Sequence, residues 1–431
     1  MKKKVLALLL VVALVASLAI VLAACNPTDD GNSGNELELP AFEIDNPDYS
    51  AVIAELASKP DFKFGMICLH DENSTYDKNF IDAMYEAQAA LGLSDEQVII
   101  VTGIPEDDSC YQKARELAEE GCDIIFANSF GHEQYMIKAA KQYPNVLFAH
   151  ATGTKAHTEN LPNFVNAFAS IYEGRYMAGV AAGLKLNEMI ESGEITAAQA
   201  KMGYVGAFTY AEVMSGYTAF YLGAKSVCPT VTMDVTFTGS WYDETAENNA
   251  AKSLISGGCV LISQHADSMG APNACEEAGV PNVSYNGSTA AACPDTFIVS
   301  SRINWAPYYT YLVNSLVNGT EVAKDWTGTI ATGSVVLTAL GPNAPAEGTQ
   351  AALDQVKAGL QNGTINVFDT ANWTVDEQKL TSYLADVDTD AAYAKDTEAI
   401  ENGIFFESKH RSAPYFDVEI DGITLLDRNY G

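Results

Sequence analysis

Short apolar runs alternate with amphipathic segments along most of this chain, and the alternation occurs twice. In the first half, the runs Phe64–Leu69 and Val98–Val101 are separated by Asp77–Leu91, where apolar residues recur at helical spacing. The pattern restarts at Met202–Ala207 and continues to Thr296–Ser300. Strands that alternate with helices in this way predict βαβ units around a parallel sheet. Two successive units therefore predict an α/β protein with two doubly wound parallel-sheet lobes.

A cleft between these lobes is the expected binding place, because ligands of doubly wound sheets bind beyond the carboxyl ends of the strands. We assign the N-terminal lobe to residues 61–170, completed by part of 301–431, and the C-terminal lobe to residues 171–300. Residues 301–431 also contain the return through the hinge and an acidic C-terminal extension without a predicted function. Within that extension, the runs on either side of Asp421-Gly422 predict a β-hairpin.

The N-terminus has the form of a bacterial lipoprotein signal. Three lysines at positions 2–4 precede Val5–Ala24, a run of 20 apolar or small residues interrupted only by Ser17. The sequence Leu-Ala-Ala-Cys that ends at Cys25 resembles a lipobox, whose Cys is lipidated and becomes the new N-terminus. We expect a signal peptide over 1–24, lipidation of Cys25, a flexible tether over 25–60, and a location at the extracytoplasmic face of the cell membrane. An uncleaved anchor is the alternative, because a membrane span needs ~20 residues.

The charge and the missing motifs disfavour several function classes. The chain has 24 Lys and Arg against 56 Asp and Glu, and its net charge of −32 repels nucleic-acid phosphates. No P-loop sequence is present, so any ATPase is a separate chain. The six histidines include no pair at helical metal-ligand spacing, and we expect neither a metal nor a cofactor. We also expect no enzymatic activity; the alternative is a hydrolase acting through His265 and Asp267.

Seven cysteines follow Cys25, which is an odd number, and no two of them form a C-x-x-C motif. Most of them lie in apolar runs, where a free cysteine behaves as a small hydrophobic residue. We therefore expect buried thiols. One disulfide among Cys228, Cys259, Cys275 and Cys293 stays open as an alternative.

Polar and aromatic side chains follow the predicted strands, at the edge of each sheet where a ligand is expected. Aromatic rings stack on a flat heterocycle, while amide and carboxylate groups pair with the donors and acceptors on its edge. The same residue types suit a sugar, so composition alone does not choose between the two. The ligand-binding candidates selected in this way are Asp71, Asn73, Tyr76, Asp77, Phe80, Asn128, Ser129, Phe130, Phe208, Tyr210, Trp241, Gln264, His265, Asp267 and Asn286.

Several stretches in one order also carry a resemblance to a known family. They are Tyr76–Phe80, Asn163–Gly183, Met202–Ala207, and Gly239–Asp243 followed by Leu261–Asp267 and Trp305. These stretches resemble the basic membrane protein family, which consists of lipoproteins similar to a purine nucleoside receptor that serve ABC importers. The resemblance implies a periplasmic-binding-protein type I-like fold with a hinge and a ligand cleft between the lobes.

The resemblance also implies roles for single residues. Asp77 and Phe80 match the acid and the ring of the family's ligand loop, and Asp267 matches a carboxylate of the second lobe that can hold ribose hydroxyls. Ile81 stands where the family motif has Asn, which removes an amide. The implied function is capture of a purine nucleoside or nucleobase and its delivery to a membrane ABC permease. The alternatives are a pentose-type sugar ligand, a ligand-sensing lipoprotein without transport, and an extracellular nucleoside hydrolase.

Overall fold

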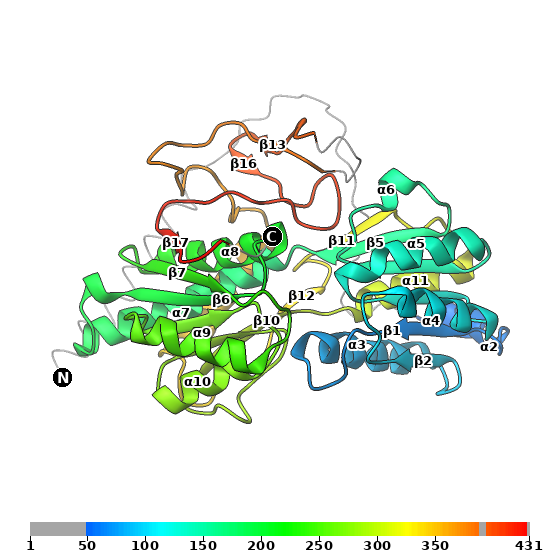
Figure 1. Cartoon of the computed structure of the whole chain (residues 1–431), viewed down its shortest axis with the longest axis horizontal. Helices are drawn as coiled ribbons and strands as arrows, with labels where there is room; N and C mark the ends of the chain where they lie inside the picture. Colours follow the sequence, from blue (N-terminus) through cyan, green and yellow to red (C-terminus); the bar gives the residue numbers. More distant parts are fainter. Residues whose placement is uncertain (1–48, 388–393, 429–431) are drawn as a thin grey trace.

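The computed structural model describes residues 49–387 and 394–428. Cys25, the expected signal peptide and most of the expected tether lie outside these residues. The described chain forms two α/β lobes side by side, with the C-terminal segment lying across both (Figure 1). The predicted α/β class with two parallel-sheet lobes is confirmed. Among the described residues, no helix is long and apolar enough to span a membrane.

The first lobe contains a six-stranded parallel sheet in the order β11-β5-β4-β3-β1-β2. Its strands are β1 (Phe64–Ile67), β2 (Val98–Val101), β3 (Ile124–Ala127), β4 (Leu147–Ala151), β5 (Phe164–Ala169) and β11 (Asp325–Gly328). Its helices are α2 (Ser50–Ala57), α3 (Thr75–Leu91), α4 (Asp108–Glu119), the short η1 (Phe130–His132), α5 (Glu133–Gln142), α6 (Ala156–Glu159) and α11 (Ala306–Asn318). The residues of β1, β3, β4 and β5 are all buried, as expected for strands with helices on both faces.

The second lobe contains a seven-stranded sheet in the order β12-β10-β9-β8-β6-β7-β17, in which β12 pairs antiparallel with β10. Its strands are β6 (Lys201–Gly206), β7 (Thr232–Phe237), β8 (Leu261–Gln264), β9 (Asn282–Tyr285), β10 (Phe297–Ile303), β12 (Val335–Leu337) and β17 (Ile423–Leu425). Its helices are α7 (Ile171–Ser192), the short η2 (Ala197–Gln199), α8 (Ala211–Val227), α9 (Glu244–Ser256), α10 (Gly270–Ala278) and α12 (Thr349–Gln361).

Three connections cross between the lobes, from β5 to α7, from β10 to α11, and from β11 to β12. Helices α7 and α8 pack very closely in the second lobe. A Cβ added to Gly179 would lie 2.0 Å from the carbonyl oxygen of Phe220, and one added to Gly223 would lie 2.0 Å from that of Tyr176. Glycine at both positions therefore permits the backbones of α7 and α8 to touch.

Two expectations from the sequence are wrong. The tether was predicted to extend to residue 60, but Ser50–Ala57 forms α2, and its Val52 and Leu56 are buried in the core. Their spacing of four residues places both on one face of the helix. The hairpin around Asp421-Gly422 is absent from the described residues: only Ile423–Leu425 forms a strand, and it pairs parallel with β7. Backbone hydrogen bonds from Met233 to Gly422 and from Leu426 to Val235 hold this strand at the edge of β7.

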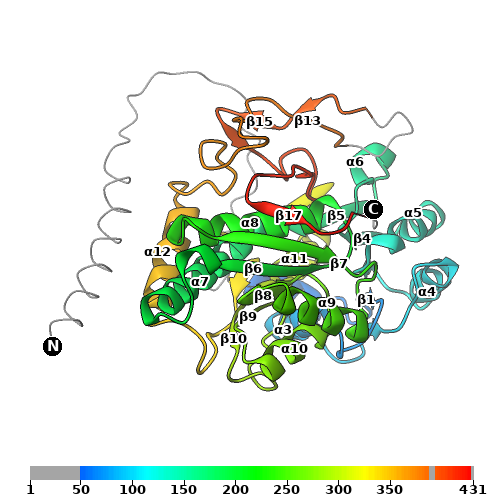
Figure 2. The same cartoon turned by 60° about the vertical axis from the view of Figure 1, so that its left-hand side comes forward.

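The C-terminal segment after α12 lies against both lobes, as two views show (Figures 1 and 2). It contains the small strand pairs β13 (Leu384–Ala385) with β14 (Thr397–Glu398) and β15 (Ile400–Glu401) with β16 (Ile404–Phe405). Ser412 donates to Asp325 of the first lobe with both its backbone N and its Oγ, each at 2.9 Å. Ser215 of the second lobe donates to Glu407. The seven cysteines of the described chain are buried and unpaired.

Candidate ligand-binding site between the lobes

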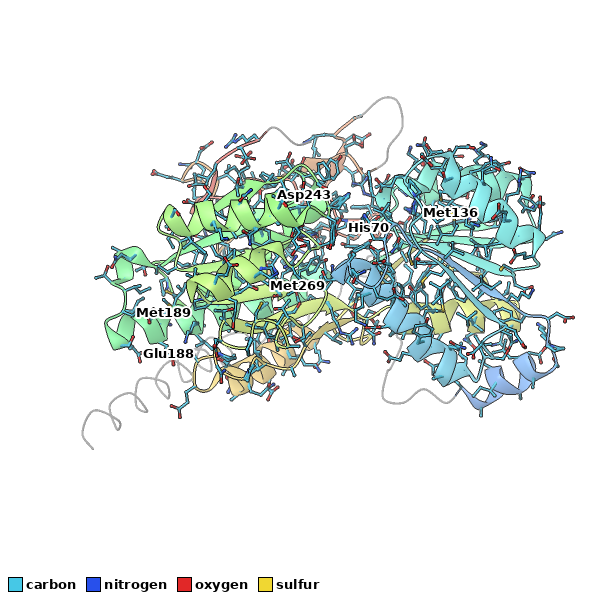
Figure 3. The ribbon with its side chains drawn as sticks, turned by 60° about the horizontal axis from the view of Figure 1, so that its bottom comes forward. His70, Met136, Glu188, Met189, Asp243 and Met269 are labelled. Carbon is cyan, nitrogen blue, oxygen red and sulfur yellow. The ribbon has the colours of Figure 1, made fainter. Side chains whose placement is uncertain are left out.

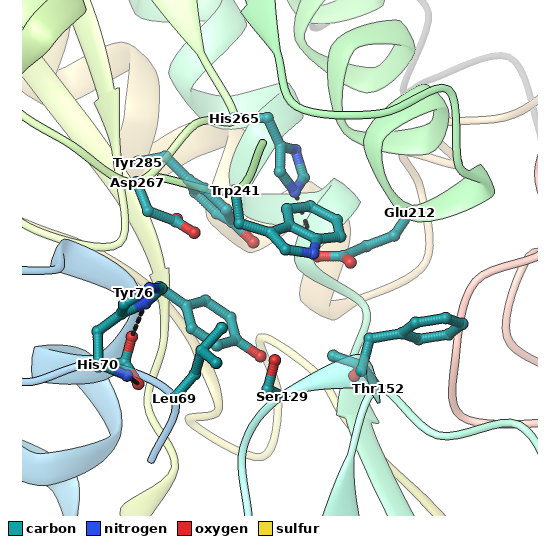
Figure 4. A pocket seen from close by; sticks show the side chains of 12 residues that line it. Leu69, His70, Tyr76, Ser129, Thr152, Glu212, Trp241, His265, Asp267 and Tyr285 are labelled. Atoms are coloured by element: carbon teal, nitrogen blue, oxygen red, sulfur yellow. Dashed lines mark hydrogen bonds and ion pairs between the residues drawn. The ribbon is translucent and has the colours of Figure 1, made fainter. Parts of the chain in front are cut away.

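A pocket lies where the carboxyl ends of the two sheets face each other (Figure 4). It encloses about 410 Å³ of space, part of which is open solvent. The first lobe contributes Leu69, His70, Tyr76, Asp77, Ser129, Phe130 and Thr152. The second lobe contributes Glu212, Trp241, His265, Asp267 and Tyr285.

Asp77 organises the wall of the first lobe. It lies in the first turn of α3, whose N-cap Ser74 accepts a hydrogen bond from the backbone N of Asp77. The Asp77 carboxylate accepts from the backbone N of His70 at 3.0 Å and from Nδ2 of Asn128 at 2.7 Å. Burial acts to raise the pKa of Asp77, but hydrogen bonds from His70 and Asn128 outweigh it and lower the pKa. Asp77 is therefore a carboxylate largely used by the protein itself.

The hydroxyl groups of the first-lobe wall donate their hydrogens to the protein. A ligand consequently meets these oxygens as acceptors rather than donors. The three bonds run from Tyr76 Oη to the Asn128 carbonyl at 2.6 Å, from Ser129 Oγ to Glu106 at 2.6 Å, and from Thr152 Oγ1 to the Ala151 carbonyl at 2.5 Å.

Asp267 differs from Asp77 because its carboxyl receives no hydrogen bond from any residue that the structure describes. The residue is 6 % exposed and lines the pocket. Burial, followed by the nearby acids Glu247 and Asp77, raises the pKa of Asp267 well above its usual range. A buried polar group without a partner costs free energy. The Asp267 carboxyl is therefore the group that gains most from a polar ligand.

The same residue joins the two lobes through its backbone. The Asp267 carbonyl accepts from the backbone N of Thr75 at 3.2 Å and from its Oγ1 at 3.0 Å. Two pairs of rings also meet across the cleft, Phe130 with Tyr210 at 5.8 Å and His70 with Tyr242 at 5.6 Å between centroids. Figure 3 shows His70 near the inner end of the second lobe, close to Asp243. The lobes are thus in contact at the rim of the pocket.

The structure brings together some of the residues selected from the sequence and not others. Those that line the pocket are Tyr76, Asp77, Ser129, Phe130, Trp241, His265 and Asp267. Those that do not are Asp71, Asn73, Phe80, Asn128, Phe208, Tyr210, Gln264 and Asn286. Asn128 and Gln264 act behind the pocket: Asn128 holds Asp77 and Leu69, and Gln264 accepts from Asn282.

The other residues outside the lining have different surroundings. Phe80 is fully buried and stacks on Trp305 with ring centroids 4.5 Å apart. Asp71 accepts from the backbone and side chain of Asn73 in an exposed turn. Phe208 and Tyr210 stack on each other beside Trp241 and support that ring from outside. Asn286 directly follows β9 and has a left-handed backbone conformation with φ 61°. Its Nδ2 is buried without a partner among the described residues.

Sequence reasoning missed five lining residues, which are Leu69, His70, Thr152, Glu212 and Tyr285. All except Glu212 lie within three residues of the end of a strand, or at it, so the rule used for the others could have found them. Glu212 lies in the first turn of α8 and carries no local signal. Among the described residues, no group of three or more His, Cys, Asp or Glu is placed to hold a metal ion.

Comparison with known proteins assigns the fold and the family. Residues 64–367 match the model of the family described as PnrA-like ABC transporter substrate-binding proteins. This chain belongs to that family. Substrate-binding proteins of ABC importers work outside the cytoplasm, where they hand a small molecule to a membrane permease. The expectation taken from the sequence resemblance is confirmed at this level.

Two relatives and one solved structure illustrate the similarity. A purine-binding protein of Brucella abortus is 30% identical over 72% of this chain and 80% of its own length. A protein of Haloferax volcanii named as an ABC transporter glucose-binding protein is 34% identical over 56% of this chain, and the match spans 57% of that protein. An ABC transporter solute-binding protein from Conexibacter woesei has the same fold, with a TM-score of 0.56 at 22% identity over 70% of this chain and 97% of that one.

Proposed function

We propose that this substrate-binding protein captures a purine nucleobase or nucleoside without a phosphate group. The observation that carries the proposal is the unpartnered Asp267 carboxyl, buried in a pocket that is lined by four aromatic residues, Tyr76, Phe130, Trp241 and Tyr285. Figure 4 shows Trp241 and Tyr285 on the side of Asp267, with Tyr76 facing them from the other lobe. Rings of this kind stack on a flat base, and a carboxyl pairs with the N–H groups on its edge. The purine-binding relative supports the same ligand class.

The charge of the lining favours an uncharged ligand that donates hydrogen bonds. Asp77, Glu212 and Asp267 line the pocket, and its basic side chains are His70 and His265. Burial lowers the pKa of His265, so this ring is neutral near pH 7. The hydrogen bond to Asp77 raises the pKa of His70, but this ring is already paired with the Asp77 carboxylate, with Nδ1 and Oδ2 3.4 Å apart. A phosphate group would therefore meet Asp77 and Glu212 with little unpaired positive charge to compensate. Nucleotides are expected to bind far more weakly than the corresponding nucleosides.

A sugar is the second candidate, because one relative is named as glucose-binding and sugar hydroxyls also donate to carboxylates. In either case we propose that the pocket binds without turning its ligand over. We further propose that Cys25 carries the lipid anchor and that the residues between Cys25 and α2 tether the folded part to the membrane. We also propose that the first lobe begins with α2 at Ser50 and extends to residue 170, that the second lobe spans residues 171–300, and that C-terminal elements complete both. Expression of a Cys25→Ser variant, which should appear in the medium rather than in the membrane fraction, tests the anchor.

Isothermal titration of the chain without its signal peptide tests the ligand class. The panel contains adenine, guanine, adenosine, guanosine, GMP, ribose and glucose, and each mixture is afterwards examined for hydrolysis products. We expect saturable binding of at least one base or nucleoside, weaker binding of GMP than of guanosine, and unchanged ligands. Binding of glucose or ribose alone would replace the purine proposal with the sugar, and release of free base would overturn the proposal of binding without turnover.

A further inference from the structure

Arg175 lies behind the pocket and belongs to no part of its lining. It is in the second turn of α7 and is fully buried. One of its terminal nitrogens donates to the Gln264 carbonyl at 3.1 Å, and the other lies 3.1 Å from Nδ1 of His265. Its guanidinium carbon lies 3.5 Å from the centroid of the Tyr285 ring. Arg175 thus touches two residues of the pocket wall from the side that faces away from the ligand.

The contact with Arg175 determines which nitrogen of His265 carries the proton. A guanidinium has donors and no acceptor, so Nδ1 of His265 must accept. The Tyr204 hydroxyl also lies near this nitrogen, at 3.4 Å. The single ring proton then lies on Nε2, which is 3.2 Å from Oε1 of Glu212 and donates to it. A chain of contacts therefore runs from Arg175 through His265 to a carboxylate in the pocket.

This series of contacts leaves the second carboxylate oxygen of Glu212 available to the ligand. His265 occupies Oε1, and no described residue donates to Oε2. Without the proton on Nε2, the ring and the carboxylate would present two acceptors to each other and separate. The stacking of Arg175 on Tyr285 adds a cation–π contact, which is strengthened by the burial of both groups. The two contacts fix two adjacent parts of the second-lobe wall.

We propose that Arg175 is a positioning residue for ligand recognition: it imposes the Nε2-protonated form of His265, which presents Glu212 as an acceptor, and it holds the Tyr285 ring from behind. The proposal rests on the proposed function of the pocket. It assigns Arg175 no contact with the ligand. The second-lobe wall is consequently in its binding geometry before the ligand arrives, which reduces the cost of ordering side chains on binding.

The surroundings of His265 keep this arrangement insensitive to pH. The groups that face the ring are Arg175, Glu212, Tyr204 and Tyr285. Burial raises the pKa of Tyr204 to about 12 and that of Tyr285 well above its usual range, so neither tyrosine ionises near neutral pH. Gly216 of α8 permits the close packing, because a Cβ there would lie 3.1 Å from Nδ1 of His265.

Two variants of Arg175 separate positioning from mere packing. Arg175→Met keeps the length of the side chain and removes every donor, whereas Arg175→Lys keeps one donor and the charge. Arg411→Met is the matched control, because Arg411 is also buried but lies in the C-terminal segment. The first readout is the nitrogen NMR spectrum of histidine-labelled protein without ligand, with His265 assigned by a His265→Gln variant. The second readout is titration with adenine and guanosine as probes.

In the wild type we expect a protonated Nε2 and a bare Nδ1 at His265 near pH 7. Arg175→Met should lose this preference for Nε2, and its affinity for the bound probe should fall at least tenfold. Arg175→Lys should restore much of both properties, and Arg411→Met should change neither. A wild-type spectrum with Nδ1 protonated would overturn the proposal, as would an Arg175→Met protein with unchanged spectrum and affinity.

The NMR spectrum is recorded without ligand, so the proposed ligand class and the proposed role of Arg175 can fail separately. If neither probe binds the wild type while the spectra behave as expected, the ligand class is wrong and the role of Arg175 in the wall stands. If Arg175→Met does not fold, Glu212→Gln provides the second test. This variant keeps the shape of Glu212 but removes its charge, and it should weaken probe binding while leaving the proton on Nε2 of His265.

Discussion

Replacing Asp267 by Asn should weaken ligand binding and stabilise the empty protein at neutral pH. The carboxyl lines the pocket and receives no hydrogen bond from any residue that the structure describes. Leaving a buried polar group without its partner costs about 1–3 kcal/mol, and about 1.4 kcal/mol corresponds to a tenfold change in affinity. Loss of the bond between the ligand and Asp267 therefore predicts a dissociation constant about 5- to 150-fold higher. Asn keeps the size of the side chain, so the pocket shape is preserved.

The stability effect follows from the raised pKa of Asp267. An acid whose pKa is higher in the folded than in the unfolded chain stabilises the fold below its unfolded pKa of about 3.9, and this contribution is lost as the pH rises. Asn carries no charge at any pH, so Asp267→Asn should unfold at a higher temperature than the wild type at pH 8 and lose this advantage toward pH 4. Asp71→Asn is the control, because Asp71 lies in an exposed turn outside the pocket. Wild-type affinity in the Asp267→Asn protein would refute the reasoning.

Three further outcomes are expected. Phe130→Ala should raise the dissociation constant at least tenfold because Phe130 lines the pocket, and it should change the melting temperature little because this residue is 45% exposed. The control in the same titration is Phe406→Ala, since Phe406 is 37% exposed and lies outside the pocket lining. Phe80→Ala should lower the free energy of unfolding in urea by about 3–5 kcal/mol, since its ring is fully buried against Trp305. Thr75→Val removes one bond to the Asp267 carbonyl and should weaken binding by about tenfold or less; a larger loss in titration would indicate a different role for Thr75.

The alternation of apolar runs predicted the fold because buried parallel strands leave a strong local signal. The strand-end rule then found Ser129, Trp241 and Asp267, since the carboxyl ends of both sheets face the pocket. Phe80 was selected through the family resemblance and not by this rule; it lies on a helix and outside the pocket lining. Phe80, Met84 and Leu91 share the buried face of α3. That face was visible in the sequence, and it favours the core over the ligand.

Other features depend on contacts between distant parts of the chain. Asn128 follows a strand as expected, but its amide turns toward Asp77 instead of the cleft. Arg175 meets Gln264 and His265 about 90 residues later in the sequence. The local signal there is one arginine in a helix rich in small residues. Such a signal marks an unusual position without showing what the charge contacts.

The contacts at the pocket rim suggest how the ligand controls closure. The lobes meet through two hydrogen bonds from Thr75 to one carbonyl and through the ring pairs described above. Each hydrogen bond contributes only about 0.5–1.5 kcal/mol net. With the lobes in contact, the unpartnered Asp267 carboxyl is 6 % exposed, and this burial costs free energy while the pocket is empty. A ligand that bonds to Asp267 removes this penalty only in the closed form, and a ligand shifts a two-state equilibrium by its difference in affinity for the two states. The same carboxyl thus links selectivity for a donor ligand to the closed shape that a permease can recognise.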